Sequence, residues 1–126
     1  MASGGHYLLI GDGAALPLLR ARLRRLPAEA HAIVVVEADI APDFETAARI
    51  TLHRLSRRVL YGPRTLNDLL KGLFLPQDGL RAWVSCGHDQ SRLICDQLID
   101  DHGVRRERIE ASGGLGPVLY TLDASA

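Results

Sequence analysis

A glycine-rich loop near the amino terminus is the first segment whose residue types could bind a ligand. It reads Gly11-Asp12-Gly13-Ala14-Ala15-Leu16-Pro17 and follows a short apolar run. Glycines let the backbone approach a ligand closely, and the free amides where a helix begins favour a phosphate group. The dinucleotide-binding fingerprint has a small residue where Leu16 stands, so the match is incomplete. A tight turn capped by Asp12 explains the same residues, and both interpretations stay open.

Charged residues follow the next two apolar runs. Glu37 and Asp39 come at the end of the second, where an acid can accept the ribose hydroxyls of an adenosine. The same acid would repel a 2′-phosphate unless arginines compensate. Arg54, Arg57 and Arg58 come after the third run and could do so. For Arg57 and Arg58 we favour the simpler interpretation, which is a solvated charged surface.

A fourth candidate segment reads Ser85-Cys86-Gly87-His88-Asp89. The glycine would let a planar ring approach the backbone, His88 could exchange a proton, and Asp89 could cap a following helix. Serine, histidine and aspartate within five residues do not make a catalytic triad, and the sequence contains no Gly-x-Ser-x-Gly motif. We therefore assign no catalytic residue.

These loops lie between alternating strands and helices. Short apolar runs predict strands over 6–10, 32–37, 50–55, 82–86 and 108–112. Helical spacing predicts one helix over 16–26 and another over 89–102, with Gly103 as the C-cap of the latter. It also predicts a helix between Gly62-Pro63 and Pro76, whose apolar face consists of Leu66, Leu69, Leu70, Leu73 and Phe74. Residues 38–48 read as a loop with at most one helical turn, and residues 118–122 as a further strand candidate.

The alternation predicts an α/β fold. Strands separated by helices pair in parallel through right-handed crossovers, which gives a three-layer sandwich with an open, mainly parallel sheet of about five strands. Ligands bind such sheets at the carboxyl ends of the strands, near the point where the strand order reverses. We therefore expect the loops after Ile10, Glu37, Leu55 and Cys86 to form the binding edge.

Composition excludes several function classes. The 126 residues suit one domain, and 15 basic against 15 acidic residues argue against nucleic-acid binding. No apolar run could cross a membrane and no signal peptide is visible, so we expect a cytoplasmic protein with no membrane partner. Five scattered histidines lack the spacing of metal ligands. The separation of Cys86 and Cys95 is neither that of a thiol-redox motif nor that of a zinc site, so we expect both to be buried, reduced thiols.

Five motifs in chain order resemble a known family. They are Tyr7-Leu8-Leu9-Ile10-Gly11-Asp12 with Ala15-Leu16-Pro17, Ala32-Ile33-Val34-Val35-Val36-Glu37, Leu52-His53-Arg54, Ala82-Trp83-Val84 with Gly87, and Arg106-Glu107-Arg108-Ile109 with Ser112-Gly113. Together they resemble the C-terminal NAD(P)H-binding domain of siderophore-interacting proteins, which are flavin-dependent ferric-siderophore reductases of the ferredoxin-reductase-like superfamily. The resemblance covers about residues 7–113.

The resemblance implies a Rossmann-like domain over 1–126 that binds NADPH or NADH. By it, the loop from Gly11 to Pro17 faces the pyrophosphate, Arg54 meets the adenosine phosphate, and the strand end from Trp83 to Gly87 lies near the nicotinamide, with Cys86 and His88 beside it. Full-length relatives carry an upstream flavin-binding barrel that these residues do not contain. We therefore expect FAD to act only through a partner domain, and this chain to be inactive as a reductase alone.

An α/β domain of this kind can also have two other functions. The first is a non-enzymatic interaction or regulatory module of the same fold, which would form a homodimer through a sheet edge or through Val118 to Leu122. The second is a phosphoacceptor signalling domain, which needs an aspartate at the end of the third strand and an acidic pair after the first. Here the third strand ends His53-Arg54 and only Asp12 follows the first, so this function is disfavoured.

Overall fold

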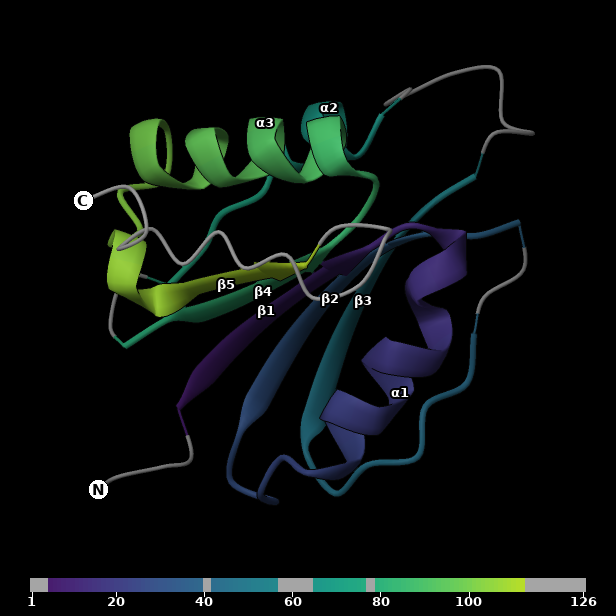
Figure 1. Ribbon diagram of the computed structural model, residues 1–126. Coiled ribbons are helices and arrows are strands. Elements are labelled where there is room, and N and C mark those ends of the chain that lie inside the picture. Colours follow the sequence, from purple (N-terminus) through teal and green to yellow (C-terminus); the bar gives the residue numbers. More distant parts are fainter. Residues whose placement is uncertain (1–4, 40–41, 57–64, 77–78, 113–126) are drawn as a thin grey trace.

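The computed structural model describes residues 5–39, 42–56, 65–76 and 79–112 (Figure 1). The elements in chain order are β1 (His6–Gly11), η1 (Gly13–Ala15), α1 (Leu16–Arg24), β2 (His31–Glu37), β3 (Arg49–Leu55), α2 (Leu66–Lys71), β4 (Arg81–Ser85), α3 (His88–Asp100), η2 (Arg106–Arg108) and β5 (Ile109–Ser112). The predictions for Arg57, Arg58, Gly62-Pro63 and residues 118–122 lie outside the described residues.

The five strands form one sheet in the order β3-β2-β1-β4-β5, and every neighbouring pair is parallel. The first strand of the chain is therefore the central one. Leu9, for example, lies opposite Val34 of β2 on one side and Trp83 of β4 on the other. The chain builds outward from β1 to β3 and then returns to place β4 against the other side of β1. This confirms the open parallel α/β sheet of Rossmann-like type.

Helices cover both faces of the sheet (Figure 1). Because side chains alternate across a strand, β1 and β2 send successive residues into two separate cores. One core, under α2 and α3, contains Leu8, Ile10, Ile33, Val35, Val84, Leu66, Leu70, Ile94 and Leu98. The other, under α1, contains Leu9, Val34, Val36, Leu19, Leu23 and Trp83. The three layers therefore follow directly from β-strand periodicity.

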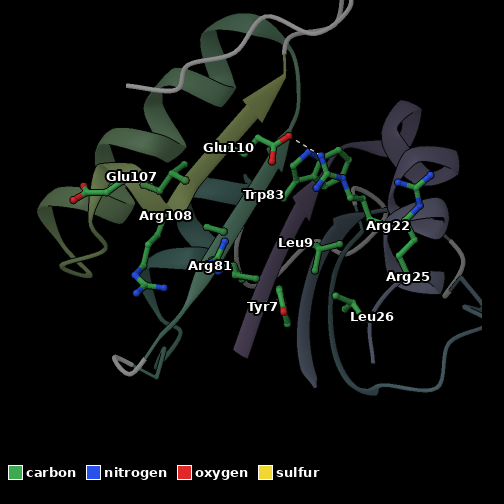
Figure 2. Close-up of a pocket in the computed structure, with 13 residues that line it drawn as sticks. Tyr7, Leu9, Arg22, Arg25, Leu26, Arg81, Trp83, Glu107, Arg108 and Glu110 are labelled. Carbon is green, nitrogen blue, oxygen red and sulfur yellow. Dashed lines mark hydrogen bonds and ion pairs between the residues drawn. The ribbon is translucent and has the colours of Figure 1, made fainter. Parts of the chain in front are cut away.

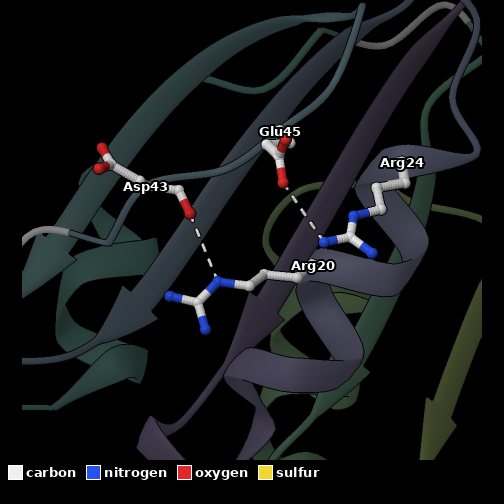
Figure 3. Close-up of polar contacts among 4 residues, drawn as sticks. All are labelled: Arg20, Arg24, Asp43 and Glu45. Atoms are coloured by element: carbon white, nitrogen blue, oxygen red, sulfur yellow. Dashed lines mark hydrogen bonds and ion pairs between the residues drawn. The ribbon is translucent and has the colours of Figure 1, made fainter.

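An extended segment, residues 42–48, widens the layer formed by α1. Phe44 packs against the core under the helix, and the Thr46 hydroxyl donates to the carbonyl of Leu23 at 2.5 Å. Two arginines of α1 donate hydrogen bonds to the same segment (Figure 3). Arg20 donates to the Asp43 carbonyl at 3.4 Å, and Arg24 donates to the Glu45 carboxylate at 3.5 Å.

The helical turn allowed for residues 38–48 is absent from the described part, 38–39 and 42–48. The physical reason is that Phe44 and Thr46 anchor to α1 from an extended backbone.

The second helix is shorter than its apolar spacing predicted. Thr65 caps α2 through its side-chain oxygen, which accepts from the Asp68 amide at 3.0 Å, and the helix ends at Lys71. Leu73 therefore lies beyond the helix, and Phe74 is 91% exposed. The expectation that the helix continues to Phe74 was wrong, because α2 ends at Lys71 with Gly72 as its C-cap.

Candidate functional site

The loop after β1 is fixed to the neighbouring strand β4. The Asp12 amide donates to the Ser85 carbonyl at 3.3 Å, and the Ala15 amide donates to the Asp12 carbonyl at 3.0 Å, which closes the first helical turn. This junction lies where the strand order reverses, between β1 and β4. The Asp12 side chain makes no capping hydrogen bond, so the predicted aspartate cap was wrong. Its backbone, rather than its carboxylate, holds the turn.

The two glycines of this loop have different roles. A Cβ atom on Gly11 would lie 2.9 Å from Leu19 Cδ1 and 3.0 Å from Ala15 Cβ, so only glycine lets α1 pack this closely on β1. Gly13 is exposed, and a Cβ there would meet only the Glu37 carbonyl at an ordinary 3.5 Å. Packing therefore requires Gly11 but leaves Gly13 open to a ligand.

The other residues of the loop likewise include both exposed and buried side chains. Ala14 and Pro17 are exposed, whereas Ala15 is buried under the helix start. Pro17 occupies the first turn of α1, as predicted, where its missing amide hydrogen costs no hydrogen bond. The exposed backbone of Gly13 and Ala14 at the start of a helix is the part of the loop that can face an anion.

The charged residues after β2 and β3 come together, as the sequence analysis expected. Val36 pairs with Arg54 and Glu37 with Leu55 across the two strands. The Arg54 Nη1 donates to the carbonyls of Ala38 and Asp39 at 3.0 and 2.7 Å. These bonds hold the exposed guanidinium over the end of β2 and leave Nη2 and Nε able to donate elsewhere.

The turn between β4 and α3 is organised by Ser91, which the sequence analysis missed. Its hydroxyl accepts from the Cys86 amide and donates to the Cys86 carbonyl, both at 3.1 Å, and the side chain is fully buried. Gly87, not Asp89, is the N-cap of α3, so the predicted Asp89 cap was wrong. The signal for Ser91 was its position on the apolar face of the helix, one turn before Ile94 and Cys95.

Two of the candidate residues in this turn are accessible and one is not. Gly87 and His88 are exposed at the start of α3. Cys86 is 3% exposed and its side chain belongs to the core under α2 and α3. Burial raises the pKa of Cys86 to about 12 and that of Cys95 to about 11. Both are free, buried, neutral thiols, which confirms the expectation of unpaired cysteines and removes them as nucleophiles.

Trp83 lies away from this edge. Its indole belongs to the core under α1, and the Arg22 guanidinium carbon lies 4.9 Å from the ring centroid. Within β4, only Ser85 and the turn that follows it reach the carboxyl edge of the sheet. Ser85 is itself buried and its carbonyl accepts from the Asp12 amide, so any contact between the end of β4 and a ligand at that edge falls to Gly87 and His88.

Neither a metal centre nor a membrane-spanning helix emerges from the described residues. Within 5–39, 42–56, 65–76 and 79–112, no three histidine, cysteine, aspartate or glutamate side chains gather closely enough to hold a metal ion. In the same ranges, every helix is too short or too polar to cross a bilayer. The exposed residues in the loops at the carboxyl edge of the sheet form the candidate site.

The family model described as siderophore-interacting protein matches residues 5–113. The chain belongs to the siderophore-interacting protein family. This confirms the resemblance drawn from the five sequence motifs. No curated protein matches the chain.

Three solved structures have the same fold. A siderophore utilization protein from T. fusca superposes with a TM-score of 0.66 at 23% identity over 94% of this chain. The siderophore-interacting protein SipS from Aeromonas hydrophila gives 0.67 at 19% identity over 86%. The siderophore-interacting protein from Acinetobacter baumannii gives 0.65 at 15% identity over 86%. The matched region spans 48, 50 and 45% of those chains, so this family chain corresponds to about half of each.

Proposed function

We propose that this chain is the NAD(P)H-binding unit of a ferric-siderophore reductase, with the dinucleotide lying along the carboxyl edge of the sheet. The observation that carries the proposal is the hydrogen bond from the Asp12 amide to the Ser85 carbonyl. It joins the loops after β1 and β4 at the reversal of strand order, which is where open parallel sheets bind nucleotides. The exposed backbone of Gly13 and Ala14 lies directly beside this junction.

The pyrophosphate would contact the start of α1. Helix-start amides have no partners within the helix, and the helix dipole adds partial positive charge there. The first turn of α1 contains no acidic residue to compete with an anion. Gly13 leaves room for the backbone to approach, since its nearest neighbour would be at ordinary contact distance even with a Cβ atom.

The adenosine would lie over the end of β2, between Glu37 and Arg54. Glu37 favours NADH because a carboxylate can accept the ribose hydroxyls, whereas Arg54 favours NADPH because a guanidinium can bind the 2′-phosphate. The bonds from Arg54 to the Ala38 and Asp39 carbonyls hold its remaining donors at this position. The affinity of the chain for the two cofactors will show which residue dominates.

The bound dinucleotide would supply a hydride, which a flavin on a partner domain would accept for the reduction of a ferric siderophore. The part played by this chain's residues is binding and orientation. The turn with Gly87 and His88 would position the nicotinamide, and Ser91 would keep that turn rigid. We expect this system to operate in the cytoplasm, as the sequence analysis predicted.

Calorimetric titration of the full chain with NADPH and with NADH tests the proposal. We expect saturable binding, and Arg54→Ala should weaken NADPH binding about tenfold or more, because a hydrogen bond to a charged group is lost. Arg92→Ala, an exposed arginine on α3, is the matched control. Equal melting temperatures for the variants would separate lost binding from lost folding. No saturable heat with either nucleotide at millimolar concentration would refute the proposal.

One observation favours a second function, a non-enzymatic interaction module. Phe74 is 91% exposed just beyond α2, which is unusual for a large aromatic side chain. If neither nucleotide bound, a partner surface around Phe74 would be the next hypothesis. Light scattering of the chain and of Phe74→Ser at high concentration would test the homodimer form, since self-association through this residue predicts a larger mass only for the unmodified chain.

A further inference from the structure

A cavity of about 400 Å³ opens on the face of the sheet beside α1, at the edge opposite to the proposed nucleotide site (Figure 2). It lies over the first residues of β1, β4 and β5 and against the last turn of α1. Cavities of this size accommodate small organic ligands. We call it the amino-edge groove.

The floor of the amino-edge groove is apolar. Leu9 and Trp83 belong to the core under α1 and are 3% and 8% exposed. Tyr7 and Leu26 are partly buried and pack against the same core. Leu9 and Trp83 are already largely withdrawn from water, so the apolar surface that an occupant would cover belongs mainly to Tyr7 and Leu26. This surface favours a ligand with an apolar body.

At one end of the groove, the positive charge of an arginine is neutralised by a carboxylate. Arg22 Nη2 lies 2.6 Å from Glu110 Oε2, and its guanidinium stacks over the Trp83 ring (Figure 2). This arginine joins α1 to β5 across the face of the sheet. Because it already has a carboxylate partner, its charge is not available to a ligand without the loss of that ion pair.

Three further arginines give the groove a surplus of positive charge. Arg25 lies on the side of α1, and Arg81 and Arg108 lie on the side of β4 and β5 (Figure 2). None of the three forms an ion pair with any residue in the described parts of the chain. Glu107 also lines the groove, but Figure 2 shows its carboxylate on the side away from α1. The walls are thus cationic above an apolar floor.

We propose that the amino-edge groove binds a small aromatic carboxylate. The planar guanidinium of an arginine binds a carboxylate through two parallel hydrogen bonds, and the apolar floor would cover the ring. An inorganic anion would leave the floor in contact with water, and a neutral aromatic compound would leave the arginine charges uncompensated. A small aromatic carboxylate matches both features. The groove is at the opposite edge of the sheet from the proposed nucleotide site, so the proposal does not depend on nucleotide binding.

Trp83 provides the readout, because it is the only tryptophan of the chain. Its indole N–H gives a single cross-peak in a ¹⁵N–¹H spectrum. The full chain would be titrated with 2-naphthoate and, separately, with the neutral naphthalene-2-carboxamide. We expect 2-naphthoate to shift the Trp83 signal saturably and the carboxamide to bind about tenfold or more weakly, because it lacks the charge.

Arginine variants test which side chains hold the carboxylate. Arg81→Gln or Arg108→Gln should weaken 2-naphthoate binding about tenfold. Arg92→Gln should bind it as the unmodified chain does, because Arg92 is an exposed residue of α3 and does not line the groove. Binding should also be unchanged in saturating NADPH.

Two results would overturn the proposal. One is the absence of any saturable shift of the Trp83 signal up to about 10 mM probe, which corresponds to a binding free energy weaker than about 3 kcal/mol. The other is equal binding of the carboxylate and the carboxamide. A failure of NADPH to bind would refute the proposed function and leave this result unaffected.

Discussion

The Ser91 hydroxyl bridges both backbone groups of Cys86, accepting from its amide and donating to its carbonyl at 3.1 Å each. One fully buried side chain thereby closes the turn that leads from β4 into α3. In most helices an exposed capping residue at the first position does this work. Here the N-cap is Gly87, which has no side chain, and the hydrogen bonds that hold the turn come instead from Ser91 within the helix.

Ser91→Ala should destabilise the chain by about 1–3 kcal/mol, because it leaves two buried backbone groups of Cys86 without their partner. Chemical denaturation measures the loss. Threonine at this position retains the hydroxyl, so Ser91→Thr should retain more stability than Ser91→Ala. A Ser91→Ala chain as stable as the original would show that the turn does not depend on this side chain.

Gly11→Ala should destabilise the chain by about 1–3 kcal/mol through overpacking. The new methyl would lie 2.9 Å from Leu19 Cδ1 and 3.0 Å from Ala15 Cβ, so the buried Leu19 side chain and the start of α1 would have to shift to admit it. Gly13→Ala, two residues on, is the matched control and should change stability by less than about 0.5 kcal/mol, since its methyl would make only ordinary contacts. Thermal melts of the two variants compare them directly, and equal losses would contradict the close approach of α1 to β1.

Both cysteines should resist thiol reagents in the folded state at pH 8. Burial raises their pKa values from 9.0 to about 12 for Cys86 and about 11 for Cys95. The reagent should react rapidly only after the chain is unfolded in denaturant. Rapid labelling of the folded chain would contradict the buried positions.

The same shifts predict how stability depends on high pH. A thiol whose folded pKa is raised contributes stability that is fully present below its unfolded pKa of 9.0 and is lost as pH rises toward 11 or 12. The free energy of unfolding should therefore fall in this window, by up to about 1.4 kcal/mol per thiol and pH unit. A variant with Cys86→Ala and Cys95→Ala should show a smaller fall, measured by denaturation at each pH.

His31 should titrate below its ordinary pKa of 6.5. Partial burial lowers the pKa, and the positive charges of Arg49 and His6 add to the effect. Because the folded pKa is depressed, the stability that His31 contributes is present above pH 6.5 and is lost as pH falls through the folded pKa. An NMR titration of the ring protons would measure it, with the urea-unfolded chain as reference. A midpoint at or above 6.5 in the folded chain would contradict the arrangement.

The strands were the easiest elements to predict from the sequence. A β-branched run such as Ile33 to Val36 can bury both of its faces only inside a parallel sheet, and it does so in β2. The glycine-rich loop, the residues after β2 and Arg54 were likewise brought to one edge, because the carboxyl ends of parallel strands meet there. Local pattern and topology rules suffice for these features.

What could not be predicted depends on contacts between distant residues. The ion pair between Arg22 and Glu110 joins residues 88 positions apart, and nothing in a single sequence indicates it. The caps expected from Asp12 and Asp89 failed because cap geometry is decided by where the backbone leaves the strand. The amino-edge groove was missed for the same reason, since its lining comes from four separate segments of the chain.

The central position of β1 has a consequence for how the chain folds during synthesis. β1, β2 and β3 are consecutive, so this half of the sheet can pair as soon as its residues leave the ribosome. The other side of β1 must wait for β4, because Tyr7 pairs with Arg81. Until then the nascent chain exposes an unpaired edge of β1, the kind of edge that recruits other strands. The carboxyl edge between β1 and β4 is thus completed only after β4 has been synthesised.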